Sequence, residues 1–482
     1  MKKYIAIAFM ALTISSCQLV DVLDKKPEFE ADLEGAITDP KSVELALNGV
    51  YSKLPSNGYN IIFPTMQGSF QAGTMLRQDS ITSGNSINMM ERYANILSYS
   101  SNFTDAEWDA DYQTIKNANF LIEAVNKIDE KKFAPGRKNE VIGEVHFLRA
   151  FANSRLIERY AEYWDLNSKY GLILRNESPN AGNAYKQRST VAESYQAIFS
   201  DLDVAIANAP KYKASYQASA QAAKAQKAKM LFYSKQYEAA LKLLKEVKAE
   251  VKLETTYGGI FDKHNSTSEI LFARVFGAKE AASTTVRENA YGKGYWGPTK
   301  EFEAIAGDDP RTNAIYSHIP KLEYGGKVQY NIKSVKKAFN TNNDMPIMYM
   351  RVAELYLMEA ECLYRTGADF ATAYEPIAVV RNRGGAEVSV PSSVQEMEDA
   401  ILNEWIIEMS FENWHEWYAV QRFCDGDNLD FAKLMELNSS LRKRYEDEKD
   451  KGAELSRMKI RRINRIPPSE TNTNPVEQNP GW

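Results

Sequence analysis

The sequence predicts a mainly α-helical protein in which pairs of antiparallel helices form a scaffold that carries long irregular loops and a few short strands. Apolar residues recur every three or four positions over long stretches, and these stretches come in pairs separated by short polar or Gly-containing breaks. Between the pairs lie two long tracts without helical periodicity. No linker rich in Pro, Ser and Gly follows residue 30, so residues 31–482 are expected to form one domain.

The first helix pair is predicted on the two sides of a polar break at residues 131–136. The apolar stripe before the break consists of Ile115, Ala118, Ile122, Val125 and Ile128. The stripe after the break consists of Val141, Val145, Leu148, Ala152, Leu156 and Tyr160. Because the break is short, the two helices are expected to pack antiparallel.

Two later pairs are predicted, one in residues 217–251 with a break at 234–236, and one after Pro346 with a break at Gly367. Pro376 lies inside the returning helix of the last pair and is expected to kink it, because proline removes a backbone hydrogen bond.

The two later pairs resemble each other in sequence. Ala-Lys-Met-Leu-Phe at 228–232 is followed by Ala240, and Ala-Glu-Cys-Leu-Tyr at 360–364 is followed by Ala373. Small alanines at these positions let neighbouring helices approach closely, and stacked pairs bury a continuous core. The pattern is typical of tetratricopeptide-like repeats.

The two aperiodic tracts cover about residues 55–103 and 255–344, and short strand candidates appear in the second tract, notably the stretch 269–276. Such long irregular loops in a compact domain are usually functional, so the ligand site is expected there.

The N-terminus is typical of a lipoprotein signal peptide over residues 1–16. Lys2 and Lys3 precede an apolar run that is too short to span a bilayer, and two small residues lead into Cys17. The Cys17 thiol is therefore the predicted site of lipid attachment, and residues 17–30 are the predicted tether. A plain secretory signal with an incidental cysteine is the alternative.

Charge and metal-ligand spacing exclude several classes of function. Without the two signal lysines, 57 of the 59 basic residues remain against 64 acidic ones, which argues against a nucleic-acid partner. Cys362 and Cys424 stand in no redox or metal spacing and are expected in the core. The four histidines lie far apart, so no metal and no cofactor is predicted.

A series of short motifs follows the order found in one known family. They are Leu-Ala-Leu-Asn-Gly-Val-Tyr at 45–51, Gly-Glu-Val-His-Phe-Leu-Arg-Ala-Phe at 143–151, Asp-Pro-Arg at 309–311, Arg-Val-Ala-Glu-Leu-Tyr-Leu-Met at 351–358, Arg-Asn-Arg-Gly-Gly at 381–385 and Gln-Asn-Pro-Gly-Trp at 478–482. In this order they resemble the RagB/SusD family of outer-membrane nutrient-binding lipoproteins. The segments 159–174 and 404–422 depart from the family pattern, which warns against transferring a particular ligand.

The resemblance implies a lipid-anchored, non-catalytic protein on the outer membrane, facing the cell exterior. Such a protein captures oligosaccharides and passes them to a TonB-dependent transporter of SusC type. Capture of oligopeptides is the alternative within the family, and a glycoside hydrolase is a more distant alternative that would require a pair of carboxylates flanking a cleft.

Candidate ligand contacts lie in the two tracts. Tyr291, Tyr295 and Trp296 stand among glycines and are expected to form an exposed aromatic patch for sugar rings, with Trp296 as the first choice. The alternative is that these rings fold back onto the helices. In the first tract, polar contacts are expected from Arg77, Asp79, Asn85, Asn88, Arg92 and Tyr93, each of which could instead be a solvated loop residue. Trp108 is expected in the core.

Overall fold

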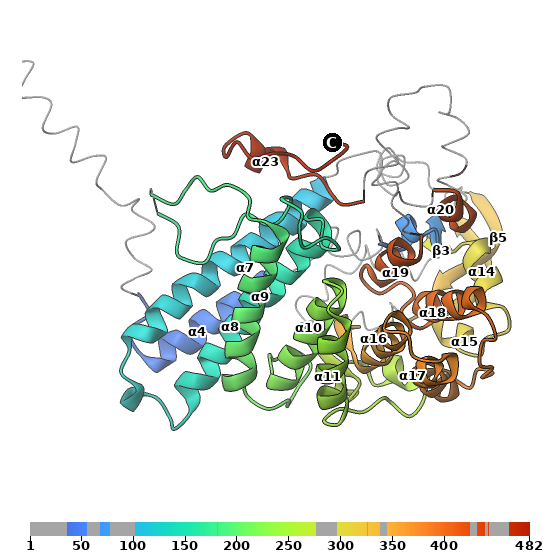
Figure 1. Cartoon of the computed structure of the whole chain (residues 1–482), viewed down its shortest axis with the longest axis horizontal. Coiled ribbons are helices and arrows are strands. Elements are labelled where there is room, and N and C mark those ends of the chain that lie inside the picture. The colour runs from blue at the N-terminus through green and yellow to red at the C-terminus, as the bar shows by residue number, and fades with distance from the viewer. Residues whose placement is uncertain are drawn as a thin grey trace, which may run out of the picture.

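The computed structural model describes residues 36–54, 68–77, 102–180, 182–275, 296–324, 326–337, 345–424, 431–438, 442 and 462–482. These residues form a mainly helical body with three two-stranded sheets, which confirms the predicted fold class. Figure 1 shows the helices side by side across the molecule, from α4 and α7 at one end to α17 and α18 at the other. Within the described ranges, no helix combines the length and the hydropathy needed to cross a membrane.

The first predicted pair is confirmed as α7 (Asn102–Lys127) and α8 (Arg137–Tyr160), joined through the short 3-10 helix η1 (Glu130–Lys132). Helix α4 (Pro40–Lys53) packs on α7, and α9 (Val191–Asn208) packs on α8. The motif residue Gly143 explains the close packing of this layer. A Cβ atom at Gly143 would lie 2.1 Å from the backbone nitrogen of Ala209, so no larger residue fits there without a shift of the backbone.

The later pairs are confirmed as α10 (Ala220–Tyr233) with α11 (Tyr237–Lys248), and α16 (Val352–Arg365) with α17 (Phe370–Gly384). Helix α11 packs on α16, so the two pairs stack as in a repeat. The repeated alanines Ala240 and Ala373 are fully buried. Helix α17 runs through Pro376 as one element.

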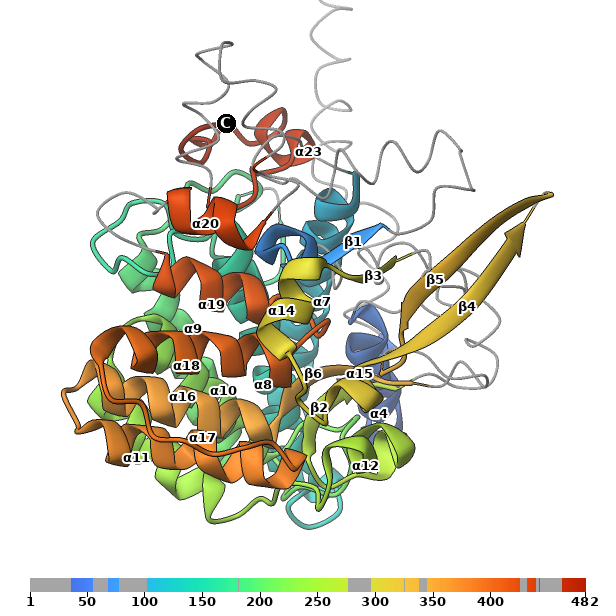
Figure 2. The same cartoon turned by 90° about the vertical axis from the view of Figure 1, so that its right-hand side faces the viewer.

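The C-terminal helices cover one side of this stack (Figure 2). They are α18 (Val394–Glu408), α19 (His415–Phe423) and α20 (Phe431–Leu437). The short α23 (Pro468–Thr471) lies instead at the α8–α9 connection, where Glu470 is 3.5 Å from Arg175. Trp405 and Trp417, in the segment that departs from the family pattern, are among the most deeply buried side chains. Cys362 and Cys424 are buried, as expected.

The described part of the second tract is not irregular as predicted. It contains α12 (Tyr257–Asp262), η2 (His264–Ser266), β2 (Ile270–Arg274), β3 (Trp296–Pro298), α14 (Lys300–Ala306), α15 (Thr312–Ile315), β4 (Tyr316–Tyr324) and β5 (Lys327–Val335). The strand β6 (Ile347–Arg351) follows the tract. Strands β4 and β5 form a hairpin that projects from the body in Figure 2.

The predicted strand at 269–276 is confirmed as β2, which pairs antiparallel with β6. The stretch directly after Pro346, predicted as the start of the third helix pair, forms β6 instead, and α16 begins only at Val352. The apolar run at 347–350 suits a strand or a helix equally well, and pairing with β2 decides between them.

Candidate functional site

Most of the predicted site residues, namely the lipidation site Cys17 and most ligand contacts, lie outside the described residues. These are Cys17, Asp79, Asn85, Asn88, Arg92, Tyr93, Tyr291 and Tyr295. Arg77 is described only as the last residue of β1 (Met75–Arg77), and Trp296 is the first residue of β3. The two tracts do meet, because β1 and β3 pair antiparallel with Arg77 opposite Trp296.

The predicted exposure of Trp296 is wrong. Its side chain is only 4% exposed, and its ring centroid lies 4.6 Å from that of Phe70 in a tilted arrangement. Pairing of β3 with β1 carries the ring inward onto the segment that precedes β1. A role of Trp296 in ligand contact stays a prediction, whereas its role in holding the two tracts together follows from its burial.

The segment 68–77, which carries β1, is anchored to α19 through one buried carboxylate. Ser69 Oγ donates to Glu416 Oε2 at 2.6 Å, and Thr74 Oγ1 donates to Glu416 Oε1 at 2.8 Å. Burial raises the pKa of Glu416 to about 7, although both hydroxyls oppose the shift. On the other side of the segment, Thr299 Oγ1 donates to the carbonyl oxygen of Gly73 at 2.7 Å.

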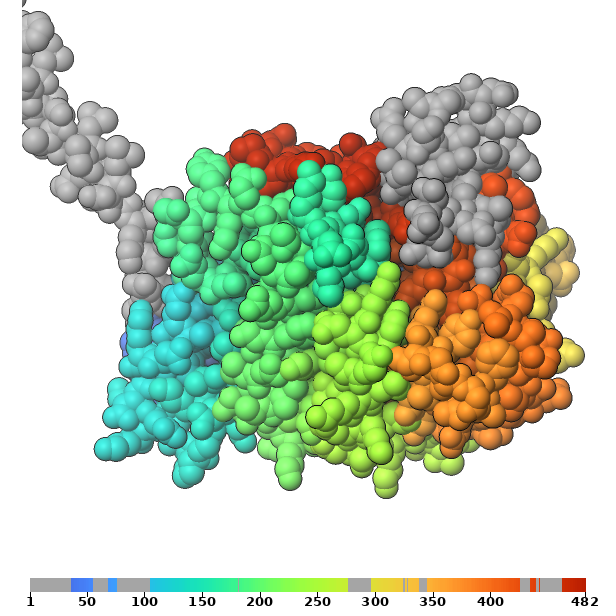
Figure 3. Space-filling view, in the orientation of Figure 1, coloured from blue at the N-terminus to red at the C-terminus, as the bar shows by residue number. Residues whose placement is uncertain are grey.

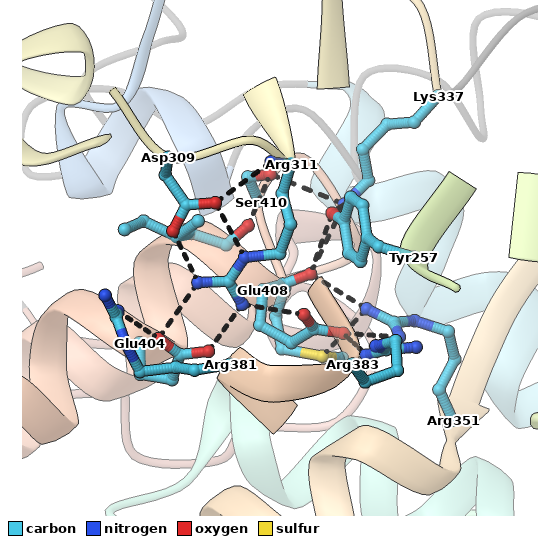
Figure 4. Close-up of polar contacts among 12 residues, drawn as sticks. Tyr257, Asp309, Arg311, Lys337, Arg351, Arg381, Arg383, Glu404, Glu408 and Ser410 are labelled. Carbon is cyan, nitrogen blue, oxygen red and sulfur yellow. Dashed lines mark hydrogen bonds and ion pairs between the residues drawn. The ribbon is translucent and has the colours of Figure 1, made fainter. Parts of the chain in front are cut away.

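The family motifs of the C-terminal half converge on a buried ionic cluster (Figure 4). Arg311, from the Asp-Pro-Arg motif, donates to Asp309, Glu404 and Glu408. Arg351 lies 2.7 Å from Glu269 and 3.0 Å from Glu408 through its Nη1 atom.

The charges of this cluster are almost all paired. Burial opposes ionisation of Glu408, but Arg383, Arg351 and Arg311 together lower its pKa to about 2. The Glu408 and Arg351 side chains are completely inaccessible to solvent. The cluster therefore holds the strands β2 and β6 against α18, and it is not open to a ligand.

A cavity of about 320 Å³ lies between α7, the connection from α8 to α9, and the C-terminal segment; we call it the α7 cavity. It is lined by Trp108, Asp109, Tyr112, Gln113, Ile115, Lys116, Asn119, Arg175, Glu177, Pro179, Asn183, Ala184, Lys186 and Glu470. Figure 3 shows the C-terminal segment in red beside the green surface of the α8–α9 connection along the upper edge. Its volume is at the lower end of the range for small-molecule sites, roughly 300–1,000 Å³.

Two aromatic rings form part of the wall of the α7 cavity. The ring centroids of Trp108 and Tyr112 lie 4.7 Å apart. The Tyr112 hydroxyl donates to the carbonyl oxygen of Ile173 at 3.0 Å, which fixes its ring. Trp108 is 3% exposed, so the prediction that it belongs to the core is confirmed, although it also lines the cavity.

The polar wall of the α7 cavity is held by hydrogen bonds to the backbone. Asn119 Nδ2 donates to the carbonyl oxygens of Arg175 and Glu177 at 2.9 and 2.8 Å, which fastens the α8–α9 connection to α7. The Arg175 guanidinium donates to the carbonyl oxygens of Asn183 and Ala184.

The charges that line the α7 cavity balance. Asp109, Glu177 and Glu470 oppose Lys116, Arg175 and Lys186. Burial and the nearby Glu470 carboxylate raise the pKa of Asp109. A neutral molecule rich in hydroxyl groups suits such a wall, because each hydroxyl both donates and accepts hydrogen bonds. The polar stretch 175–189, which has no helical periodicity, is the sequence signal that could have indicated this site.

Comparison with protein families gives two matches that together cover most of the chain. Residues 282–482 match a model described as the SusD family, and residues 22–232 match one described as starch-binding associating with outer membrane. A SusD-like protein, P38, from Formosa agariphila is 26% identical over 249 residues. That match covers 50% of this chain and 45% of the relative, so it spans less than half of the relative's length.

Solved structures show the same fold. A laminarin binding SusD-like protein is 20% identical, with a TM-score of 0.70 over 92% of this chain and 100% of its own. A SusD superfamily protein from Bacteroides vulgatus is 19% identical, with a TM-score of 0.71 over 92% of this chain and 99% of its own. The ordered motifs, the stacked helix pairs and both family matches agree that this chain belongs to the SusD/RagB family.

Proposed function

We propose that this protein captures oligosaccharides at the bacterial cell surface and passes them, without cleaving them, to a TonB-dependent transporter of SusC type. The observation that carries the proposal is the α7 cavity, in which ring faces of Trp108 and Tyr112 stand beside amide, carboxylate and ammonium groups with no net charge. Aromatic faces bury the C–H surface of a sugar ring, and the polar groups bind its hydroxyls. The laminarin-binding neighbour with the same fold supports this assignment.

The proposed location is the outer membrane, with lipid on Cys17 and the protein facing outward. One of the two matching family models is described by its association with the outer membrane. Residues 17–30 would then form the tether. Arg77, Asp79, Asn85, Asn88, Tyr93, Tyr291 and Tyr295 remain proposed ligand contacts in the two tracts.

A second candidate, a glycoside hydrolase, is favoured by one observation. Asp109 and Glu470 both line the α7 cavity, and the pKa of Asp109 is raised by burial and by Glu470. A raised pKa on one of two carboxylates is what an acid catalyst of glycoside hydrolysis needs.

The experiment is a binding screen with the protein that lacks residues 1–17. Calorimetry against a glycan panel that begins with laminarin oligosaccharides is expected to find a glycan ligand, and chromatography of the products is expected to find no hydrolysis. Binding of a peptide mixture without any glycan would favour the oligopeptide alternative, and product formation would favour the hydrolase.

A pair of variants locates the site. The double substitution Asp109→Ala and Lys116→Ala removes one charge of each sign from the α7 cavity and is expected to weaken glycan binding at least tenfold. The control, Lys245→Ala with Glu246→Ala, makes the same change on the exposed face of α11. Equal affinity of the two variants would exclude the α7 cavity as the glycan site.

A further inference from the structure

A second cavity lies at the point where the two stacked helix pairs meet α19. It has a volume of about 130 Å³ and is separate from the α7 cavity, with which it shares no lining residue. Its lining consists of Tyr163, Trp164, Phe232, Tyr233, Lys235, Tyr237, Arg365, Gln421, Arg422 and Arg462. We call it the arginine pocket.

The arginine pocket is strongly cationic. Lys235, Arg365, Arg422 and Arg462 line it, and no lining residue is acidic. One buried carboxylate, Glu361, lies beside it and compensates part of this charge. Arg422 donates to both oxygens of Glu361, at 2.9 and 3.0 Å, and Arg365 lies 3.6 Å from the same side chain. Among the described residues, Arg365 and Arg422 thus share one carboxylate, and Lys235 forms no ion pair.

The hydrogen-bonding groups of the pocket are mostly donors. Gln421 Oε1, an acceptor in the lining, already accepts the Tyr163 hydroxyl at 3.0 Å, and Gln421 Nε2 donates to the carbonyl oxygen of Arg462. Arg422 Nη1 is buried and has no hydrogen-bond partner among the described residues. A buried guanidinium nitrogen without an acceptor is costly, and an anion in the pocket would supply that acceptor.

Aromatic rings hold these cations in place and offer flat faces. The Arg422 guanidinium lies 4.7 Å from the ring centroid of Phe232 and 5.5 Å from that of Tyr233. The Arg462 guanidinium lies 5.4 Å from the ring centroid of Trp164. Rings and planar cations arranged in this way suit a ligand that carries a negative group on a compact apolar frame.

We propose that the arginine pocket binds a carboxylate or sulfate group carried by a saccharide unit, such as a uronic acid. The anionic part follows from the charges and donors that line the pocket, whereas the saccharide part rests on the proposed function. The small volume admits the charged group with part of one ring rather than a polymer chain. The α7 cavity, with balanced charges, would contact neutral parts of the same class of ligand.

The test compares glucuronate with glucose by calorimetry at constant ionic strength, on the protein that lacks residues 1–17. Glucuronate is expected to bind and glucose is not. The double variant Lys235→Gln and Arg365→Gln, which keeps Arg422 and its bond to Glu361, is expected to weaken glucuronate binding at least tenfold. The control, Lys242→Gln with Lys245→Gln, makes the same change in charge on the exposed face of α11 and is expected to bind as the unmodified protein does.

Several results would overturn the proposal. Equal binding of glucose and glucuronate, or equal affinity of the two double variants, would exclude the anion site. Inorganic sulfate that binds as tightly as glucuronate would contradict the saccharide part. By contrast, glucuronate binding that persists in the Asp109→Ala, Lys116→Ala variant would support the proposal, because it would show that glucuronate does not bind in the α7 cavity.

Discussion

The buried carboxylate of Glu416 is expected to make the stability of the protein fall with rising pH, and Glu416→Gln is expected to abolish that part of the dependence. Glu416 is fully buried, and among the described residues it forms no ion pair. It accepts hydrogen bonds only from the neutral hydroxyls of Ser69 and Thr74 among the described side chains. Ionisation therefore leaves a negative charge in a site with little to compensate it.

The magnitude follows from the shift in pKa. Burial raises the pKa of Glu416 from 4.5 to about 7, and each unit corresponds to 1.36 kcal/mol, so ionisation costs roughly 3 kcal/mol of folding free energy. Because the folded-state pKa is the higher one, the contribution is fully present below pH 4.5. It is lost as the pH rises through about 7 and does not change further in alkaline solution.

The assay is urea denaturation of the unmodified protein and of Glu416→Gln at several pH values between 5 and 8. Glutamine keeps the shape of the side chain and does not ionise, so the stability of the variant relative to the unmodified protein is expected to rise by about 2.5 kcal/mol over this range. Other buried carboxylates titrate in both proteins and cancel in the difference. The exposed Glu246→Gln is the control. A difference in stability that does not change with pH would refute the reasoning.

Three further substitutions test the packing. Arg351→Ala would leave Glu269, Glu408 and Glu412 without the cation that they share. It is expected to lower the free energy of unfolding, measured by urea denaturation, by about 3–5 kcal/mol. A loss below about 1 kcal/mol would contradict the importance of the cluster. Gly143→Ala places a methyl group against the backbone of Ala209 and is expected to cost about 1–3 kcal/mol or more. Gly49→Ala, where no atom lies within 4 Å of the added Cβ and the backbone is helical, is the comparison for glycine replacement. Trp296→Ala is expected to destabilise the protein by about 3–5 kcal/mol, because the ring is buried. If the folded variant keeps its affinity for a confirmed glycan, Trp296 is not a ligand contact.

The helix pairs could be predicted because their signal is local. Apolar stripes such as the one from Val141 to Tyr160 repeat at the helical period within a few turns, and the buried face of α8 follows them. The strand β6 could not be predicted in the same way. Its apolar residues 347–350 lie beside a helical stripe, and only pairing with β2 makes them a strand.

The candidate site was harder to predict than the scaffold. The environment of Trp296 depends on β1 and Phe70, which come from the other tract, so local sequence could not decide whether its ring is exposed. The α7 cavity is assembled from α7, the α8–α9 connection and Glu470, and the last of these is close to the C-terminus. Trp108 was recognised as a core residue, but its second role as a cavity wall depends on residues far away in the chain.

The sequence by itself determined the helix pairs, their repeat-like stacking and the family, because periodicity and motif order are properties of neighbouring residues. Only the tertiary structure decided which polar residues are paired in the core and which line a cavity. The motif arginines Arg311 and Arg351 face buried carboxylates, while Arg422 lines a pocket with one nitrogen unpaired among the described residues. The chemistry of a charged side chain depends on its burial and its partners, and both are set by contacts between segments distant in sequence.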